Sequence, residues 1–110
     1  MGKSLDFNTL KKRYFPVTLN DEKKTKLLIV PPTKRVFDEF AGMKDALENG
    51  DLGDEAISEL YGIVARLMSH NKTGIKVTKE MIEELLDFED VILFIRTYTE
   101  FITEVTNSKN

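Results

Sequence analysis

The sequence of 110 residues contains no cysteine and a single histidine, His70. Without cysteine the chain has neither a disulfide framework nor a thiolate metal site, which excludes a disulfide-stabilised secreted domain and fits a reducing cytosol. No apolar run approaches the ~18 residues that span a bilayer. The first residues, Met1–Asp6, lack the apolar core of a signal peptide. We therefore expect a soluble chain without a targeting segment.

Residues suited to catalysis are also scarce. Nucleophilic and acid–base catalysis need an activated nucleophile or a group that titrates near neutral pH. His70 offers the only imidazole, and none of the four serines lies in a Gly-x-Ser-x-Gly context. The segment 71–74, Asn-Lys-Thr-Gly, lacks the first glycine and the Gly-Lys pair of a phosphate-binding loop. We predict that the protein is not an enzyme and that His70 lies at the surface or at a helix end.

The acidic residues do not suggest a metal site. Several are adjacent in sequence, as in the pairs Asp38 and Glu39, Glu83 and Glu84, and Glu89 and Asp90. Neighbours on a helix point about 100° apart, so these pairs do not converge on one ion and are better explained as solvated faces. We predict no catalytic, metal-binding or cofactor-binding residue and no cofactor.

Charge is divided unevenly along the chain. Residues 1–35 hold nine Lys or Arg and three acids, a local charge of +6, whereas residues 36–110 hold seven and sixteen, a local charge of −9. Two interpretations stay open: head-to-tail contacts between copies or an acidic partner, and internal cancellation within the folded domain. A polyanion needs an uncompensated basic surface. We therefore expect no nucleic-acid partner.

The composition is that of an ordinary globular domain, with 41% hydrophobic and 32% charged residues. We predict a single domain over residues 1–110, with a hairpin region at 1–32, a helical region at 33–105 and a polar tail at 106–110. The predicted fold class is α+β: an N-terminal β-hairpin followed by three to four α-helices, mostly helical.

Two β-rich runs define the predicted hairpin. In the first run, Phe15, Val17 and Leu19 fall on one face and alternate with Tyr14, Pro16 and Thr18. Pro16 cannot donate a backbone hydrogen bond, which predicts an edge strand. The second run covers residues 25–30 and ends at two prolines, and the loop between the runs contains no glycine.

Helical spacing replaces alternation after Pro32. Thr33 is predicted to cap a first helix, with an apolar stripe of Val36, Phe37, Phe40, Met43, Ala46 and Leu47. Asp54 is predicted to cap a second helix that ends near residues 70–71. Gly74 is predicted to take a positive φ in the following turn, and Thr78 to cap a short third helix.

The last helix, from about Phe88, has the strongest amphipathic pattern. One stripe is formed by Phe88, Val91, Ile92, Ile95, Tyr98, Ile102 and Val105, and Leu93, Phe94 and Phe101 lie off it. This is more apolar surface than a one-sided helix needs. We expect burial on two sides, with the second side covered by another copy or a partner helix. The predicted partner-binding residues are Leu93, Phe94, Tyr98 and Phe101, because aromatic side chains concentrate binding energy at interfaces; the alternative for each ring is core packing.

Four stretches together resemble a known family. They are residues 7–14 leading into 17–19, residues 32–37, residues 71–74, and residues 88–91 continuing through Phe94, Tyr98, Phe101 and Ile102. Their order resembles the short tail assembly chaperones of long-tailed bacteriophages that infect Gram-positive bacteria. The resemblance implies a non-enzymatic chaperone that binds the tape measure protein, helps recruit tail tube protein in the host bacterial cytoplasm, and does not remain in the mature virion. It also implies that a longer form can arise by ribosomal frameshifting. From the excess apolar surface of the last helix we also expect a homo-oligomer.

Two other classes stay open on the residues alone. A small helical transcriptional or antitoxin-type regulator fits a helical domain with a basic N-terminal arm, although the five-residue break at 49–53 is not a tight helix-turn-helix and the second helix has only Arg66 as a base. An accessory subunit of a larger enzyme is the other alternative.

Overall fold

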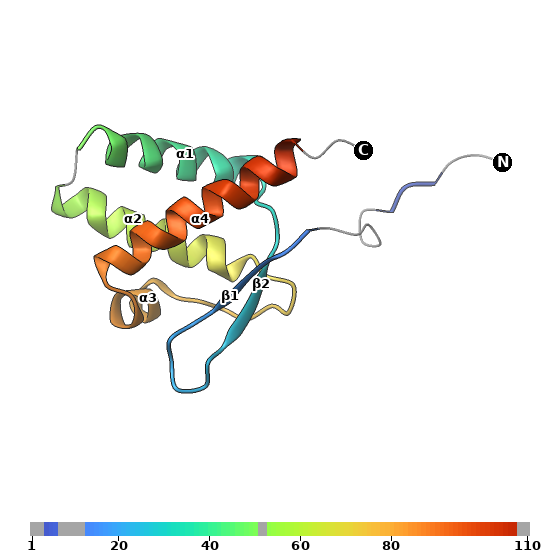
Figure 1. Cartoon of the computed structure of the whole chain (residues 1–110), viewed down its shortest axis with the longest axis horizontal. Helices are drawn as coiled ribbons and strands as arrows, with labels where there is room; N and C mark the ends of the chain where they lie inside the picture. Colours follow the sequence, from blue (N-terminus) through green and yellow to red (C-terminus); the bar gives the residue numbers. More distant parts are fainter. Residues whose placement is uncertain (1–3, 7–12, 51–52, 108–110) are drawn as a thin grey trace.

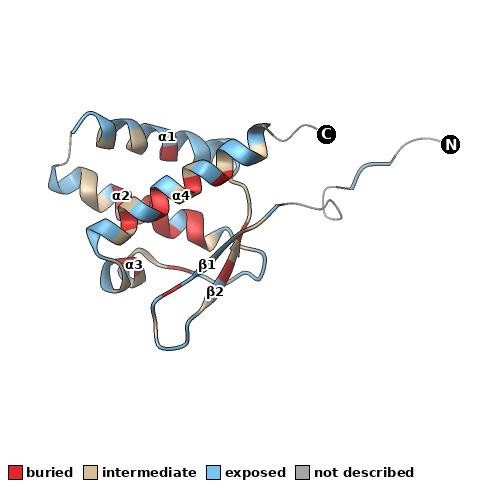
Figure 2. Ribbon diagram, viewed as in Figure 1, coloured by how far each residue is buried: buried red, intermediate tan, exposed pale blue. Residues whose placement is uncertain are grey.

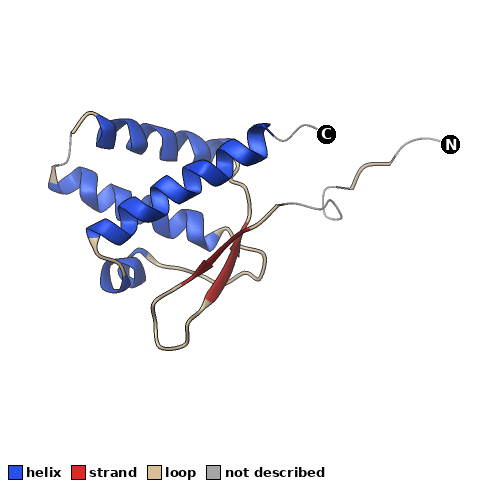
Figure 3. Ribbon diagram, viewed as in Figure 1, coloured by secondary structure: helices blue, strands red, loops and turns tan. Residues whose placement is uncertain are grey.

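The computed structural model describes residues 4–6, 13–50 and 53–107. Two strands, β1 (Phe15–Thr18) and β2 (Lys26–Ile29), precede the helices α1 (Lys34–Glu48), α2 (Asp54–Ser69), α3 (Lys79–Leu85) and α4 (Phe88–Asn107) (Figure 1). The predicted α+β class, an N-terminal hairpin followed by a mostly helical region, is confirmed (Figure 3). Helix α4 continues through residue 107, beyond the start of the predicted polar tail at 106.

The two strands form an antiparallel hairpin in which Phe15 faces Ile29 and Val17 faces Leu27. The other edge of β2 is covered by the loop after α2, because the Val30 N–H donates to the His70 carbonyl at 2.9 Å and the Lys72 N–H donates to the Leu28 carbonyl at 2.9 Å. In the part of the chain that the structure describes, β1 is therefore the free edge of the sheet. This confirms the edge position predicted from Pro16.

The hairpin loop closes without glycine. Lys24 takes the left-handed conformation with φ of 50°, and the Asp21 carboxylate accepts hydrogen bonds from the Thr25 N–H at 2.8 Å and the Thr25 hydroxyl at 2.6 Å. These two bonds to the ionised form lower the pKa of the Asp21 carboxyl below its ordinary value. A charged side chain thus fixes a turn that glycine often provides.

Local capping signals locate most helix starts. The hydroxyl oxygens of Thr33 and Thr78 accept from the backbone N–H three residues ahead, as predicted. The predicted cap at Asp54 is wrong, because the cap is Gly53 and Asp54 is the first helical residue. There its carboxylate still interacts favourably with the positive end of the helix dipole, so an acid signals the helix start at either position.

The core is centred on α2 and on the inner faces of α4 and the hairpin (Figure 2). From α2 it includes Leu60, Ile63, Val64, Ala65, Leu67 and Met68. From β2 and the adjoining loop it includes Leu27, Ile29 and Val77. Over residues 4–6, 13–50 and 53–107, no helix is long and apolar enough to cross a membrane.

Candidate partner-binding surface

The four residues predicted to bind a partner differ in how far their side chains are exposed. Tyr98 is 0% exposed, Phe94 7% and Phe101 9%, whereas Leu93 is 59% exposed. The three rings therefore belong to the core in this conformation, which is the alternative that the sequence left open. Leu93 is the member of the set that a partner can reach directly.

The hairpin is what covers these rings. Phe15 of β1 stacks on Phe101 with ring centroids 5.4 Å apart and lies 5.9 Å from Phe94. From the other side, Phe40 of α1 meets Tyr98 edge-on at 5.1 Å. The expectation that another copy or a partner helix covers the second side of this helix is wrong for the rings, because Phe15 of β1 contacts all three of them.

The core-facing stripe of α4 is also rotated from the predicted one. Val91, Ile95 and Tyr98 of the predicted stripe are buried, but Phe88 is 37% exposed. Phe94 and Phe101, predicted to lie off the stripe, are buried in its place. The rotation arises because β1 packs on the Phe94 side of α4, and it leaves the Phe88 side less covered.

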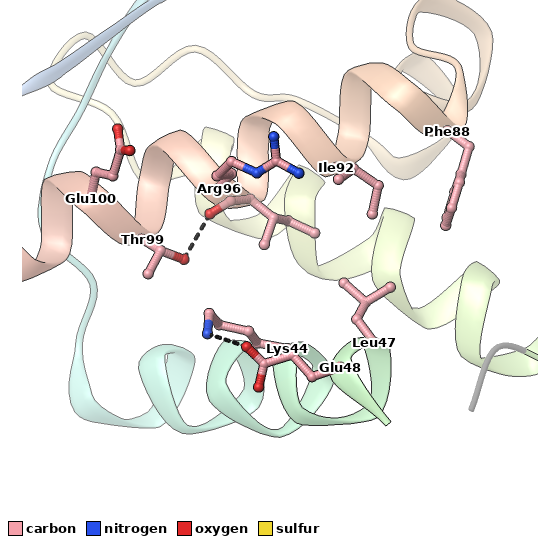
Figure 4. Close-up of a pocket in the computed structure, with 9 residues that line it drawn as sticks. Lys44, Leu47, Glu48, Phe88, Ile92, Arg96, Thr99 and Glu100 are labelled. Atoms are coloured by element: carbon pink, nitrogen blue, oxygen red, sulfur yellow. Dashed lines mark hydrogen bonds and ion pairs between the residues drawn. The ribbon is translucent and has the colours of Figure 1, made fainter. Parts of the chain in front are cut away.

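On that less covered side, a groove of about 570 Å³ runs between the C-terminal half of α1 and α4. Leu47 of α1 and Phe88 and Ile92 of α4 point into it from opposite sides, and Ile95 contributes to its wall (Figure 4). Phe88, Ile92, Ile95 and Thr99 follow one another at alternating four- and three-residue spacing, so they line one stripe of the helix. The groove is open because α1 and α4 diverge towards this end (Figure 1).

Charged side chains stand at the rim of this groove. Lys44 of α1 donates to Glu48 at 2.8 Å. On α4, Arg96 and Glu100 line the opposite side, and the residues described include no ion-pair partner for either. The groove thus combines an apolar interior with both signs of charge at its border, an arrangement that suits an amphipathic helix better than a small polar ligand.

A second, smaller groove of about 350 Å³ lies on the other side of α4, between this helix and β1. Val17 and Thr18 of β1 and Leu86, Leu93 and Thr97 of the helical part contribute to its lining. Helix α4 is therefore a ridge with one groove towards α1 and another towards β1. The sequence predicted the apolar helix itself. Neither groove could be predicted from the sequence, because each depends on how elements distant in the chain pack together.

Two titratable side chains, those of His70 and Tyr98, lie in contrasting environments. His70 is exposed at the C-cap of α2, which confirms its predicted place at a helix end. Within residues 4–6, 13–50 and 53–107, no group of three or more His, Cys, Asp or Glu could hold a metal ion. The Tyr98 hydroxyl is buried without a hydrogen-bond partner among these residues, and burial raises its pKa.

The chain was compared with protein-family models, with curated proteins and with solved structures, and none of the three comparisons found a match.

Proposed function

We propose that the protein is a non-enzymatic tail assembly chaperone of a long-tailed bacteriophage and that it holds an amphipathic helix of the tape measure protein in the groove between α1 and α4. The observation that carries this proposal is the groove itself, where Leu47, Phe88 and Ile92 line an apolar interior within a charged rim. The resemblance of the four sequence stretches supplies the identity of the partner.

The groove has the chemistry that a helix-holding chaperone needs. A tape measure helix with an apolar stripe would bury that stripe on Phe88 and Ile92, and each Å² of apolar area removed from water contributes about 25 cal/mol. Arg96 and Glu100, which have no ion partner among the described residues, would pair with charges that flank the stripe. Holding the helix in this way keeps it soluble and needs no catalytic residue.

The wider role follows from the same proposal. A chaperone of this kind acts in the host bacterial cytoplasm, passes its client to the tail tube protein, and is absent from the mature virion. No observation favours the regulator alternative: Arg66, the one basic residue of α2, is half-exposed and forms an ion pair with Glu39 of α1.

The test is co-expression of the full chain with the tape measure protein of the same phage, followed by affinity capture and a binding titration. We expect a complex that Phe88→Ser weakens by about tenfold, or about 1.4 kcal/mol. Leu93→Ser is the matched control, because it removes an exposed apolar side chain of the same helix from outside the groove. Absence of a complex would overturn the chaperone proposal, and a complex insensitive to Phe88→Ser would overturn the groove assignment.

A further inference from the structure

The hairpin has a second face, which points away from the core. Leu27 and Ile29 of β2 are buried in the core, so Lys26 and Leu28, which alternate with them, lie on the opposite face of the sheet. Pro16 of β1 faces Leu28 across the strands and lies on that face too. Lys26 and Pro16 are exposed, and Leu28 is half-buried.

The loop after α2 extends this face. The bridge between Ile29 and Asn71 places Lys72 beside Leu28, and the Lys72 N–H donates to the Leu28 carbonyl at 2.9 Å. The Lys72 side chain then crosses β2, because its Nζ lies 5.2 Å from the centroid of the Tyr14 ring, next to the start of β1. This cation–π contact holds an ammonium group over the sheet. We call the surface formed by Tyr14, Pro16, Lys26, Leu28 and Lys72 the outer sheet face.

The charges of the folded chain are divided between the sheet and the helices. Residues 13–30 hold four Lys or Arg and two acids, and residues 69–78 hold two Lys and no acid, so the sheet side carries a charge of +4 with His70 neutral. The remaining described residues from 31 to 107 hold six Lys or Arg and fifteen acids, a charge of −9. The sheet side is therefore the part of the folded chain that attracts an anion.

The two acids on the sheet side lie in the hairpin loop, beyond the strands. Asp21 is engaged there, because its carboxylate accepts two hydrogen bonds from Thr25 and interacts electrostatically with Lys23. Glu22 is exposed at the same loop. The lysines of the loop, Lys23 and Lys24, are thus offset by acids of the loop itself.

The acids of the helices do not lie on the outer sheet face either. Helix α4 packs on the inner face through Phe15, so the sheet separates most of its acids from the outer face. The Asn20 side chain donates to the Leu85 carbonyl at 2.7 Å, which places the acidic start of α4 next to the loop end of the hairpin. Lys26 and Lys72 form no ion pair within the described residues, and none of the residues that adjoin them in the sheet is an acid.

We propose that the outer sheet face binds a short acidic peptide segment of a partner protein. Lys26 lies two residues from Leu28 along β2, and Lys72 lies beside Leu28 on the neighbouring segment. Two carboxylates of the segment pair with these lysines, and an apolar side chain between them rests on Pro16 and Leu28. This surface is separate from the α1–α4 groove, and the proposal does not depend on capture of the tape measure protein.

The small extent of the positive surface selects a peptide over a nucleic acid. Affinity for a nucleic acid comes from neutralising several phosphates along a continuous backbone. The outer sheet face offers Lys26 and Lys72, and exposed Lys76 follows in the same loop. A backbone longer than this face runs against helices that carry −9, whereas a short segment with two or three carboxylates ends within it.

The experiment is a titration of the isotope-labelled full chain with a short synthetic peptide of alternating glutamate and valine, followed by nuclear magnetic resonance at low salt. We expect the backbone signals of Lys26, Leu28 and Lys72 to shift. Lys26→Glu combined with Lys72→Glu should weaken binding by about tenfold or more, and added salt should weaken binding to the wild type. A peptide with glutamine in place of glutamate should bind at least about tenfold more weakly.

The matched control is Lys44→Glu combined with Arg96→Glu, which makes the same change in net charge on the rim of the α1–α4 groove. This pair should leave the affinity for the peptide within about twofold of the wild type, since at low salt the two sites are separated by more than nearest-neighbour contact. Circular dichroism shows whether both double variants keep the helical spectrum. Because all four side chains lie at the surface or on a groove rim, we expect that they do.

Three results would overturn the proposal. One is the absence of shifts on the outer sheet face. Another is an equal loss of affinity from the two charge-reversal pairs, because it would show attraction by net charge alone. The third is tighter binding of a single-stranded DNA oligonucleotide than of the peptide at this face, which would make a nucleic acid its occupant. None of them bears on capture of the tape measure protein, for which Phe88→Ser has its own readout.

Discussion

Phe15 of β1 stacks on Phe101 of α4 with 5.4 Å between the ring centroids and 20° between the ring planes. The first strand and the last helix are thus packed directly together, although nearly the whole chain separates them. Phe15 also lies 6.1 Å from Tyr98, so one side chain closes the aromatic cluster of the C-terminal helix. The hairpin is therefore part of the core.

Replacing Phe15 by alanine should lower the free energy of unfolding by about 3 kcal/mol, at the low end of the range for such changes because the ring is partly exposed. The loss combines the apolar area of the ring and the cavity left beside Phe94, Tyr98 and Phe101. Urea unfolding followed by circular dichroism measures it. Phe37→Ala is the control: Phe37 is 38% exposed and should cost less than half as much. An equal decrease in the free energy of unfolding for the two variants would contradict the conclusion that β1 is part of the core.

The sequence predicted the elements well because their signals are local. Thr33 and Thr78 cap helices through hydroxyls that reach only three residues ahead, and Phe15, Val17 and Leu19 share a face because a strand alternates. Gly74 takes the predicted positive φ, at 77°. Each of these outcomes depends on neighbours in the chain, so a single sequence contains the information.

The candidate partner-binding surface of α4 could not be predicted in the same way. Counting apolar positions on α4 showed that two sides would be covered, but it could not tell that Phe15 would cover the Phe94 side. The groove lined by Leu47 and Phe88 exists because α1 and α4 diverge, and the angle between two helices is set by the whole packed core. Leu93 is one of four predicted contact residues, and only the three-dimensional packing distinguishes it from the buried rings.

Tyr98→Phe should leave the free energy of unfolding at pH 7 unchanged or raise it by up to about 1 kcal/mol, because the hydroxyl that it removes is buried and has no hydrogen-bond partner within the described residues. Tyr61→Phe is the matched control. The Tyr61 hydroxyl donates to the Leu86 carbonyl at 3.2 Å, and its loss should cost about 1 kcal/mol. A larger decrease in the free energy of unfolding for Tyr98→Phe than for Tyr61→Phe would contradict this prediction, because it would show that the Tyr98 hydroxyl stabilises the fold.

The same tyrosine predicts a dependence on alkaline pH. Burial raises the pKa of Tyr98 in the folded protein above the ordinary tyrosine value of about 10. Below about pH 10 the hydroxyl is protonated in both states, whereas above it the unfolded chain loses the proton and the folded chain keeps it. The free energy of unfolding should therefore fall as pH rises above about 10, and less steeply in Tyr98→Phe. Urea titrations at a series of alkaline pH values measure the two slopes, and identical slopes would contradict this origin.

His70→Ala should change the free energy of unfolding by no more than about 0.5 kcal/mol. The imidazole is exposed, and the hydrogen bonds at this residue come from its backbone, whose N–H donates to the Leu67 carbonyl at 3.2 Å and whose carbonyl accepts from Val30. Any residue with a backbone N–H preserves them. Thermal unfolding of the variant and capture of the tape measure protein measure the effect, and loss of binding would give the histidine a role that its position does not suggest.

Asn71→Ala, one residue further on, should be far more costly, at about 2 kcal/mol. The Asn71 amide donates to the Met68 carbonyl at 2.8 Å and to the Ile75 carbonyl at 2.7 Å, and its oxygen accepts from the Ile75 N–H at 2.9 Å. These bonds hold the loop whose backbone pairs with the outer edge of β2, so their loss loosens the hairpin as well as the turn. Asn71→Asp distinguishes the donated hydrogen bonds from the accepted one. It keeps an acceptor for the Ile75 N–H but places a charged oxygen against the Met68 and Ile75 carbonyls. This second substitution should therefore fail to restore stability at neutral pH, and a stability equal to that of the wild type would show that the donated bonds contribute little.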